Sequence, residues 1–110
     1  MGEYANTREL LCESLRIRRH LGLLRRYAYS FKQIAQINEL EEHYERAVQL
    51  LAVAETLRVR IGAPLEHIER KENEDALMRL RTQLGDTMFE LEWVKGATMT
   101  TEQAIALALS

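Results

Sequence analysis

The sequence predicts an all-α protein made of antiparallel helical hairpins. Apolar residues recur at three- and four-residue spacing along most of the 110 residues, which is the period of an amphipathic helix. Glycines follow these periodic stretches, where glycine commonly ends a helix, at Gly22, Gly62, Gly85 and Gly96. No stretch alternates apolar and polar residues for long enough to indicate a strand.

Length and composition predict one soluble domain. The chain is 46% hydrophobic and 29% charged, which is ordinary for a globular protein and argues against disorder. No apolar run approaches the roughly 20 residues of a membrane-spanning helix, and the first residues lack the basic flank and apolar stretch of a secretory signal. We therefore expect a cytoplasmic protein with one modest core.

The first half of the chain is expected to form helices with three separate stripes of core positions. The stripe of the first helix is Leu10, Leu11, Ser14, Leu15, Ile17 and Leu21. That of the second helix is Tyr27, Phe31, Ile34 and Ala35. The third helix spans about 41–61 and aligns Tyr44, Ala47, Val48, Leu51 and Ala54.

The second half begins with a long helix and a short one. Residues 66–84 open with a charged run, so we expect only the later half of that helix to be buried. Asp86 is the expected N-cap of a short helix that Gly96 ends. Trp93 and Phe89 on this helix are either core residues or a partly exposed binding contact, and the core reading is favoured because both stand at helical spacing.

The last predicted helix is introduced by a capping box formed by Thr100 and Gln103. Its body, residues 104–109, is apolar on nearly every side, so it must dock against the other helices or against another molecule. Ile105 and Leu109 are therefore candidate interface residues, and self-association into a homodimer is expected to be possible through this end. This helix brings the expected number to six.

The second and third helices resemble a tetratricopeptide repeat, a helix-turn-helix unit of about 34 residues. The resemblance rests on bulky, apolar and small residues in register, and the scaffold it implies is Phe31, Ile34, Ala35, Ala47, Leu51 and Ala54. Asn38 replaces the usual tyrosine, Val59 replaces the usual proline, and the turn lacks its usual glycine. The repeat resemblance implies antiparallel hairpins in a right-handed α-α superhelix.

A wider resemblance covers nearly the whole chain. The segments that carry it are 46–58, 61–65, 84–86 and 99–108, with Phe89, Trp93 and Gly96. They resemble the closing segment of large bacterial regulators, in which an ATPase module precedes tetratricopeptide-like repeats, often with a LuxR-type DNA-binding domain. The resemblance implies repeat-like helices over 1–62 and a helical C-terminal extension over 63–110, packed together as a single compact domain.

This family resemblance implies a non-catalytic interaction or regulatory module inside a transcriptional or signalling regulator. Its partner would be another protein or a neighbouring domain of the parent regulator. Candidate exposed contacts are Arg25, Arg26, Glu41 and Tyr44, with Trp93 as an apolar anchor. A homo-oligomerisation unit is an alternative.

Nucleic-acid contact is a second alternative, because Arg16 to Lys32 contains six Lys or Arg and no acid. Such a stretch suits phosphates, and its tyrosines suit base stacking. A solvated helix face, or one paired with the four acids of residues 39–45, explains the same pattern and is favoured. A net charge of -2 and the lack of a recognition motif make nucleic acid an unlikely partner for this segment.

Titratable neighbours are present, but none has the spacing of a catalytic or metal site. They are Cys12 with His20, His43 with Glu39 and Glu42, and His67 with Glu66 and Glu69. None matches a zinc-ligand spacing, and no glycine loop or oxyanion site accompanies the cysteine. The sequence therefore predicts no enzyme, no catalytic residue, no cofactor and no metal.

Overall fold

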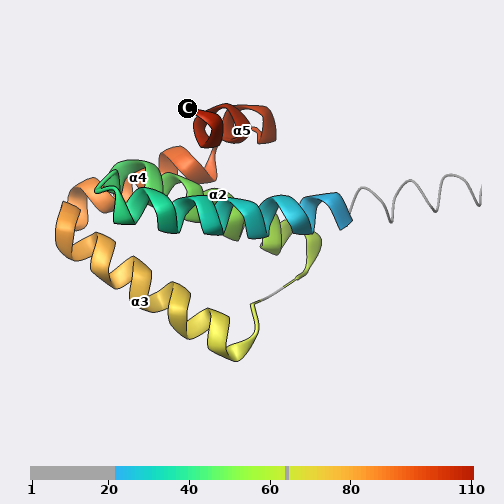
Figure 1. Cartoon of the computed structure of the whole chain (residues 1–110), viewed down its shortest axis with the longest axis horizontal. Helices are drawn as coiled ribbons and strands as arrows, with labels where there is room; N and C mark the ends of the chain where they lie inside the picture. Colours follow the sequence, from blue (N-terminus) through green and yellow to red (C-terminus); the bar gives the residue numbers. More distant parts are fainter. Residues whose placement is uncertain (1–21, 64) are drawn as a thin grey trace, which may run out of the picture.

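The computed structural model describes residues 22–63 and 65–110, and this part of the chain is helical apart from short turns. A helix over residues 22–40 is followed by α2 (Tyr44–Ile61), α3 (His67–Leu84), α4 (Asp86–Ala97) and α5 (Thr101–Leu109). The all-α prediction is confirmed, with five helices in the described residues (Figure 1). The first predicted helix and Cys12 lie outside the described residues.

The helix over 22–40 and α2 form an antiparallel hairpin, side by side in Figure 1. The first helix buries a stripe at four- and three-residue spacing, formed by Leu24, Ala28, Phe31 and Ala35. This spacing places all four side chains on one helix face. On α2, Ala47 and Ala54 are both 0% exposed and belong to the same core cluster, so the core of the hairpin includes small side chains.

The two helices of the hairpin end in the same kind of turn. At the end of the first, the N–H of His43 donates to the Asn38 carbonyl (2.8 Å) and that of Glu42 to the Glu39 carbonyl (3.1 Å). This is a Schellman motif, which requires a left-handed residue, and Glu42 has φ 64°. Gly62 has φ 66° at the equivalent position after α2. The missing turn glycine therefore leaves a glutamate in the conformation that glycine usually adopts.

The most extensive contact between the labelled helices joins α2 to α4. Gly96 is buried there, and a β-carbon at this position would lie 2.8 Å from the Cα of Gln49. The Gln49 amide also donates to the buried carboxylate of Glu92, which accepts a second bond from Lys95 (3.1 Å). Gly96 was predicted to end its helix, which is wrong: α4 continues to Ala97, and the glycine permits two backbones to touch.

Helix α3 leaves the hairpin at an angle and returns toward α4 at its C-terminal end (Figure 1). Its buried residues are only Asn73 and Leu80. An ion pair between Arg79 and Glu39 (2.9 Å) ties it to the first helix of the hairpin. The expectation that the charged opening of this helix is exposed agrees with these positions, because Asn73 is the first residue of α3 to be buried.

Helix α5 packs on the core through one face. The predicted capping box is confirmed: the Gln103 N–H donates to the Thr100 hydroxyl (3.1 Å), and the Thr100 N–H donates to the Gln103 side chain (2.9 Å). Ala104 is fully buried and Ile105 is half-buried against the core, whereas Leu109 is 81% exposed. The apolar terminal helix is thus only partly covered by the described residues.

Three predicted helix boundaries are corrected. Gly22 is helical and does not end a helix. The third helix begins at Tyr44, because residues 41–43 form the Schellman turn. Gly85, not Asp86, is the N-cap of α4, and the carboxylate of Asp86 instead accepts a hydrogen bond from Arg81 (3.2 Å).

Among residues 22–63 and 65–110, no helix has the length and apolarity needed to cross a membrane. The helices pack antiparallel, but a repeated unit and a superhelix are not established. The tetratricopeptide assignment stays a prediction.

Candidate functional site

A groove of about 430 Å³ lies between α3 and α4. We call it the α3–α4 groove, and its lining residues are Glu74, Leu77, Met78, Arg81, Phe89, Glu90 and Trp93. Its apolar side chains come from both helices, and the charged ones stand among them. Apolar surface with a few placed polar groups is the usual composition of a binding site.

One wall of the groove is an ordered stack of aromatic and cationic side chains. The rings of Phe89 and Trp93 are stacked, with centroids 6.1 Å apart. The Arg81 guanidinium carbon lies 4.3 Å from the centre of the Phe89 ring, within the range of a cation–π interaction. Phe89 and Trp93 are one helical turn apart on α4, and Arg81 of α3 packs over Phe89. This wall is therefore ordered before any ligand binds.

Arg81 is held in place by two carboxylates of α4. It donates to Glu90 (2.9 Å) and to Asp86 (3.2 Å). The hydrogen bond to Glu90, then that to Asp86, raise the pKa of the Arg81 guanidinium above its ordinary value. The guanidinium is charged at any physiological pH, so the two hydrogen bonds do not change its charge. Their effect is to hold the guanidinium in position over the Phe89 ring.

Met78 adds exposed apolar surface to the groove. Met78 is 69% exposed, although its helix neighbour Leu77 is half-buried against the core. An exposed methionine adapts its shape to a ligand because its side chain is unbranched and flexible. A second cavity, of about 490 Å³, shares Glu74, Leu77 and Trp93 with the groove, so Trp93 borders open space on two sides.

Neither the family models, nor the curated proteins, nor the solved structures contain a match to this chain. The inference of function therefore rests on the chain's own residues and on the resemblance seen in its sequence.

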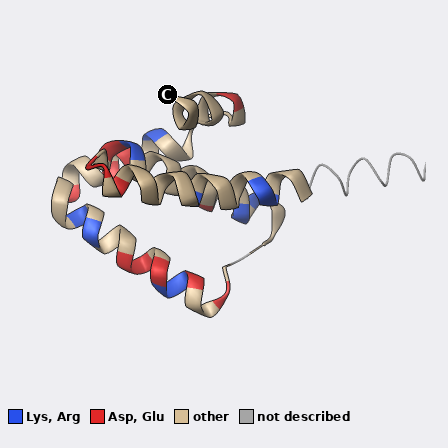
Figure 2. Ribbon diagram, viewed as in Figure 1, with Lys and Arg blue, Asp and Glu red and all other residues tan. Residues whose placement is uncertain are grey.

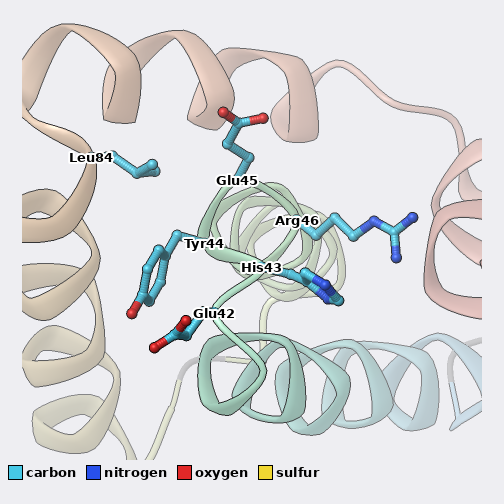
Figure 3. Close-up of a pocket in the computed structure, with 6 residues that line it drawn as sticks. All are labelled: Glu42, His43, Tyr44, Glu45, Arg46 and Leu84. Atoms are coloured by element: carbon cyan, nitrogen blue, oxygen red, sulfur yellow. The ribbon is translucent and has the colours of Figure 1, made fainter.

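A different cavity, of about 490 Å³, surrounds the turn that contains Glu42 and His43 (Figure 3). Its side chains diverge: Tyr44 and Glu42 point to one side of α2, while His43 and Arg46 point to the other. Glu45 points away from both groups. Apart from Leu84 of α3, the lining residues follow one another along the chain, and their side chains share no common centre. This cavity is therefore a weaker candidate than the α3–α4 groove.

The predicted contact residues do not form one surface. Arg25 and Tyr44 border different cavities, and Trp93 lies in the α3–α4 groove. Arg26 and Glu41 are exposed on the hairpin and line none of the cavities that contain Arg25, Tyr44 or Trp93. Of the predicted candidates, Trp93 is therefore the one that lies in the α3–α4 groove.

The predicted scaffold residues lie in the core or against it. Phe31, Ala35, Ala47, Leu51 and Ala54 are buried, and Ile34 is half-buried beside them. Their burial describes the hairpin and does not by itself establish a repeat.

Two of the titratable neighbours seen in the sequence interact with other residues. Glu39 pairs with Arg79, and His43 lies 3.5 Å from Glu41. Within residues 22–63 and 65–110, no three His, Cys, Asp or Glu side chains gather as a metal site would require. His20, like Cys12, lies outside the described residues.

Sequence reasoning missed most of the α3–α4 groove. Met78 and Arg81 were not singled out, although Glu74, Met78 and Arg81 share one face of α3 by their spacing. That signal was available. The ion pairs of Arg81 with α4 were not predictable, because they depend on how the chain turns at Gly85.

Proposed function

We propose that this chain is a non-catalytic protein-interaction module whose α3–α4 groove binds the apolar face of an amphipathic helix from a partner protein. The observation that carries the proposal is the pairing of a half-buried, stacked Trp93 with the 69%-exposed Met78 across the groove. Tryptophan anchors dominate the binding energy of interfaces, and grooves between helices commonly receive helices.

Charge selects the kind of helix. Arg81 is the single cation among the described residues that line the groove, and Glu90 already pairs with it. Glu74 has no ion pair within the described residues. The rim is therefore acidic, so the partner helix should carry Lys or Arg beside its apolar face.

The resemblance to multidomain bacterial regulators supports a regulatory use of this binding. In such a protein the helix would come from a partner or from a neighbouring domain. Occupancy of the groove would then favour one arrangement of the attached module, as a coupling free energy between two sites.

Nucleic-acid contact receives less support from the described part of the basic stretch. Arg25 and Arg26 are exposed, but Lys32 is only 8% exposed and lies between helices. Homo-oligomerisation is the other alternative, because α4 also exposes Leu91 and Val94. Nucleic-acid binding and homo-oligomerisation are both distinguishable from helix binding by experiment.

The test uses designed helical peptides and Trp93, the only tryptophan in the chain. Three 18-residue peptides are titrated: a Leu/Lys amphipathic helix, its Leu/Glu counterpart, and a Leu/Lys sequence scrambled to remove the apolar face. We expect saturable binding of the first alone, seen in Trp93 fluorescence and in the anisotropy of labelled peptide. The reason is that only this peptide offers both an apolar face and positive flanks.

Two matched variants locate the binding. Met78→Gln should weaken binding by about tenfold, the effect of losing an interface anchor. Ile68→Gln is the control, since Ile68 is 72% exposed on the same helix and does not line the groove. Equal weakening by both variants, or equal binding of all three peptides, would contradict the proposal.

Light scattering and a generic DNA duplex complete the design. A concentration-dependent dimer that Met78→Gln disperses would make a second copy of this chain the occupant. Salt-sensitive binding of the duplex, with no response to the peptides, would favour the nucleic-acid alternative.

A further inference from the structure

Two positively charged side chains are buried between the helix over 22–40 and the C-terminal half of α2. Lys32 is 8% exposed and Arg58 is 7% exposed. Fully or nearly fully buried lysine and arginine are rare unless they are paired, because removing a charge from water is costly. The question is therefore which groups balance the charges of Lys32 and Arg58.

The pairing of these two cations is incomplete. Arg58 donates to Glu55 through Nη2 (2.8 Å), but its Nε is buried without an acceptor among the described residues. No ion pair joins Lys32 to a carboxylate within residues 22–63 and 65–110. A buried arrangement of this kind is stabilised when a counter-anion is supplied.

Both cations border the same cavity, which has a volume of about 150 Å³. Arg25 and the half-buried Glu69 also line it, so the lining contains more cations than carboxylates. Figure 2 shows basic segments of the hairpin at the end opposite its acidic turn, with a further one beside that turn. The cavity is therefore an electropositive space lined by the two helices of the hairpin, the connection after α2 and the first turn of α3.

The rest of the lining limits what can enter. Apolar side chains, among them Ala28 and Ile61, form part of the wall. The volume is well below the roughly 300–1,000 Å³ of pockets for drug-sized ligands. A small molecule with an anionic head and a short apolar body fits both the charge and the walls.

We infer that this cavity is a binding site for a small organic anion, whose carboxylate or phosphate head is held by Lys32 and Arg58, with Arg25 at the same cavity. The anion would supply a direct counter-charge to Lys32, which forms no ion pair within residues 22–63 and 65–110, although Glu39 and Glu72 line a second, narrow space that Lys32 also borders. The site is separate from the α3–α4 groove, and the inference does not depend on that groove binding a helix.

The experiment measures the thermal midpoint of the full 110-residue chain with acetate, butyrate, hexanoate and phosphate as probes, at constant ionic strength against chloride. A ligand that binds the native state raises the midpoint with its concentration. We expect this rise for the carboxylates, increasing from acetate to hexanoate as more of the apolar wall is covered. A response to phosphate alone would identify the head group as a phosphate instead.

Two variants assign the response to the cavity. Lys32→Met keeps the length of the side chain and removes its charge, so we expect it to abolish the rise and to weaken calorimetric binding by about tenfold or more. Arg26→Met is the control, because Arg26 is exposed on the same helix and does not line the cavity. It should retain the full response, as should Met78→Gln in the α3–α4 groove.

Glu69→Gln gives a result in the opposite direction. Removing this carboxylate should strengthen binding of the probes, since Glu69 competes with them for the cations. The inference is overturned if the midpoint rises equally in wild type and Lys32→Met, which would be a general salt effect. It is equally overturned if no probe raises the midpoint of the wild type, because the cavity would then bind none of these anions.

Discussion

Helices α2 and α3 have the same length, 18 residues, but opposite relationships to the core. Nine residues of α2 are buried, whereas α3 buries only Asn73 and Leu80. Helix α2 contacts α3, α4 and α5 as well as its hairpin partner, so nearly every face is covered. Helix α3 is covered on one side and presents the other to solvent.

The difference between α2 and α3 suggests that one helix mainly stabilises the fold and the other mainly provides a surface for binding. Most of the apolar area removed from water lies around α2, where substitutions should chiefly affect the free energy of unfolding. The exposed face of α3 contributes little to that free energy, which leaves Met78 available for binding. The following substitutions test this division, beginning with the largest expected effect.

Gly96→Ala should destabilise the chain by more than about 4 kcal/mol, an exceptional value for one methyl group. The new β-carbon would meet backbone atoms of Gln49, which cannot rotate away, so α2 and α4 would have to separate. Urea unfolding followed by circular dichroism measures the change. Gly22→Ala is the control: its β-carbon would meet nothing within 4 Å, and we expect unchanged or slightly higher stability.

Leu80→Ala should cost about 3 kcal/mol, because it removes a fully buried side chain and leaves a cavity. Met78→Ala, two residues earlier on the same helix, should change the free energy of unfolding by less than about 0.5 kcal/mol. The same urea titration measures both. Similar losses for the two variants would mean that α3 is covered on both sides in solution, contrary to the comparison with α2.

Glu42→Gly should raise the free energy of unfolding by about 1 kcal/mol, the smallest effect of the three. Glutamate at φ 64° is strained by its β-carbon, and glycine is not. The reciprocal change, Gly62→Ala, should lower stability by about the same amount at the matching turn after α2. Thermal melts of the two variants should therefore shift in opposite directions, and parallel shifts would contradict a shared turn geometry.

Much of the helical architecture could be predicted from the sequence. The period of apolar residues indicated the hairpin and the apolar terminal helix. The run of charged residues indicated that the opening of α3 is exposed. The capping box at Thr100 was predictable to the residue, because it depends on two side chains three positions apart. Trp93 was identified as an alternative between core and contact, and it lies at the border of the two.

The predictions were wrong at residues whose role depends on contacts with a neighbouring helix. Gly96 was assigned to a helix end, yet it serves a close approach between helices far apart in sequence. Asp86 has the side chain of an N-cap, but Arg81 competes for it across the turn. Lys32 belongs to a basic stretch whose side chains were expected to be exposed to solvent or paired with acids, but its side chain is buried without an ion pair among the described residues.

The sequence by itself determined that the chain is helical and which helix faces are apolar, because both follow from spacing within one element. Only the tertiary structure decided that α3 and α4 enclose a groove and that Lys32 and Arg58 meet in one cavity. Those features depend on the angles and separations between helices. They are set by long-range packing, such as the contact of Gly96 with Gln49, which no local period encodes.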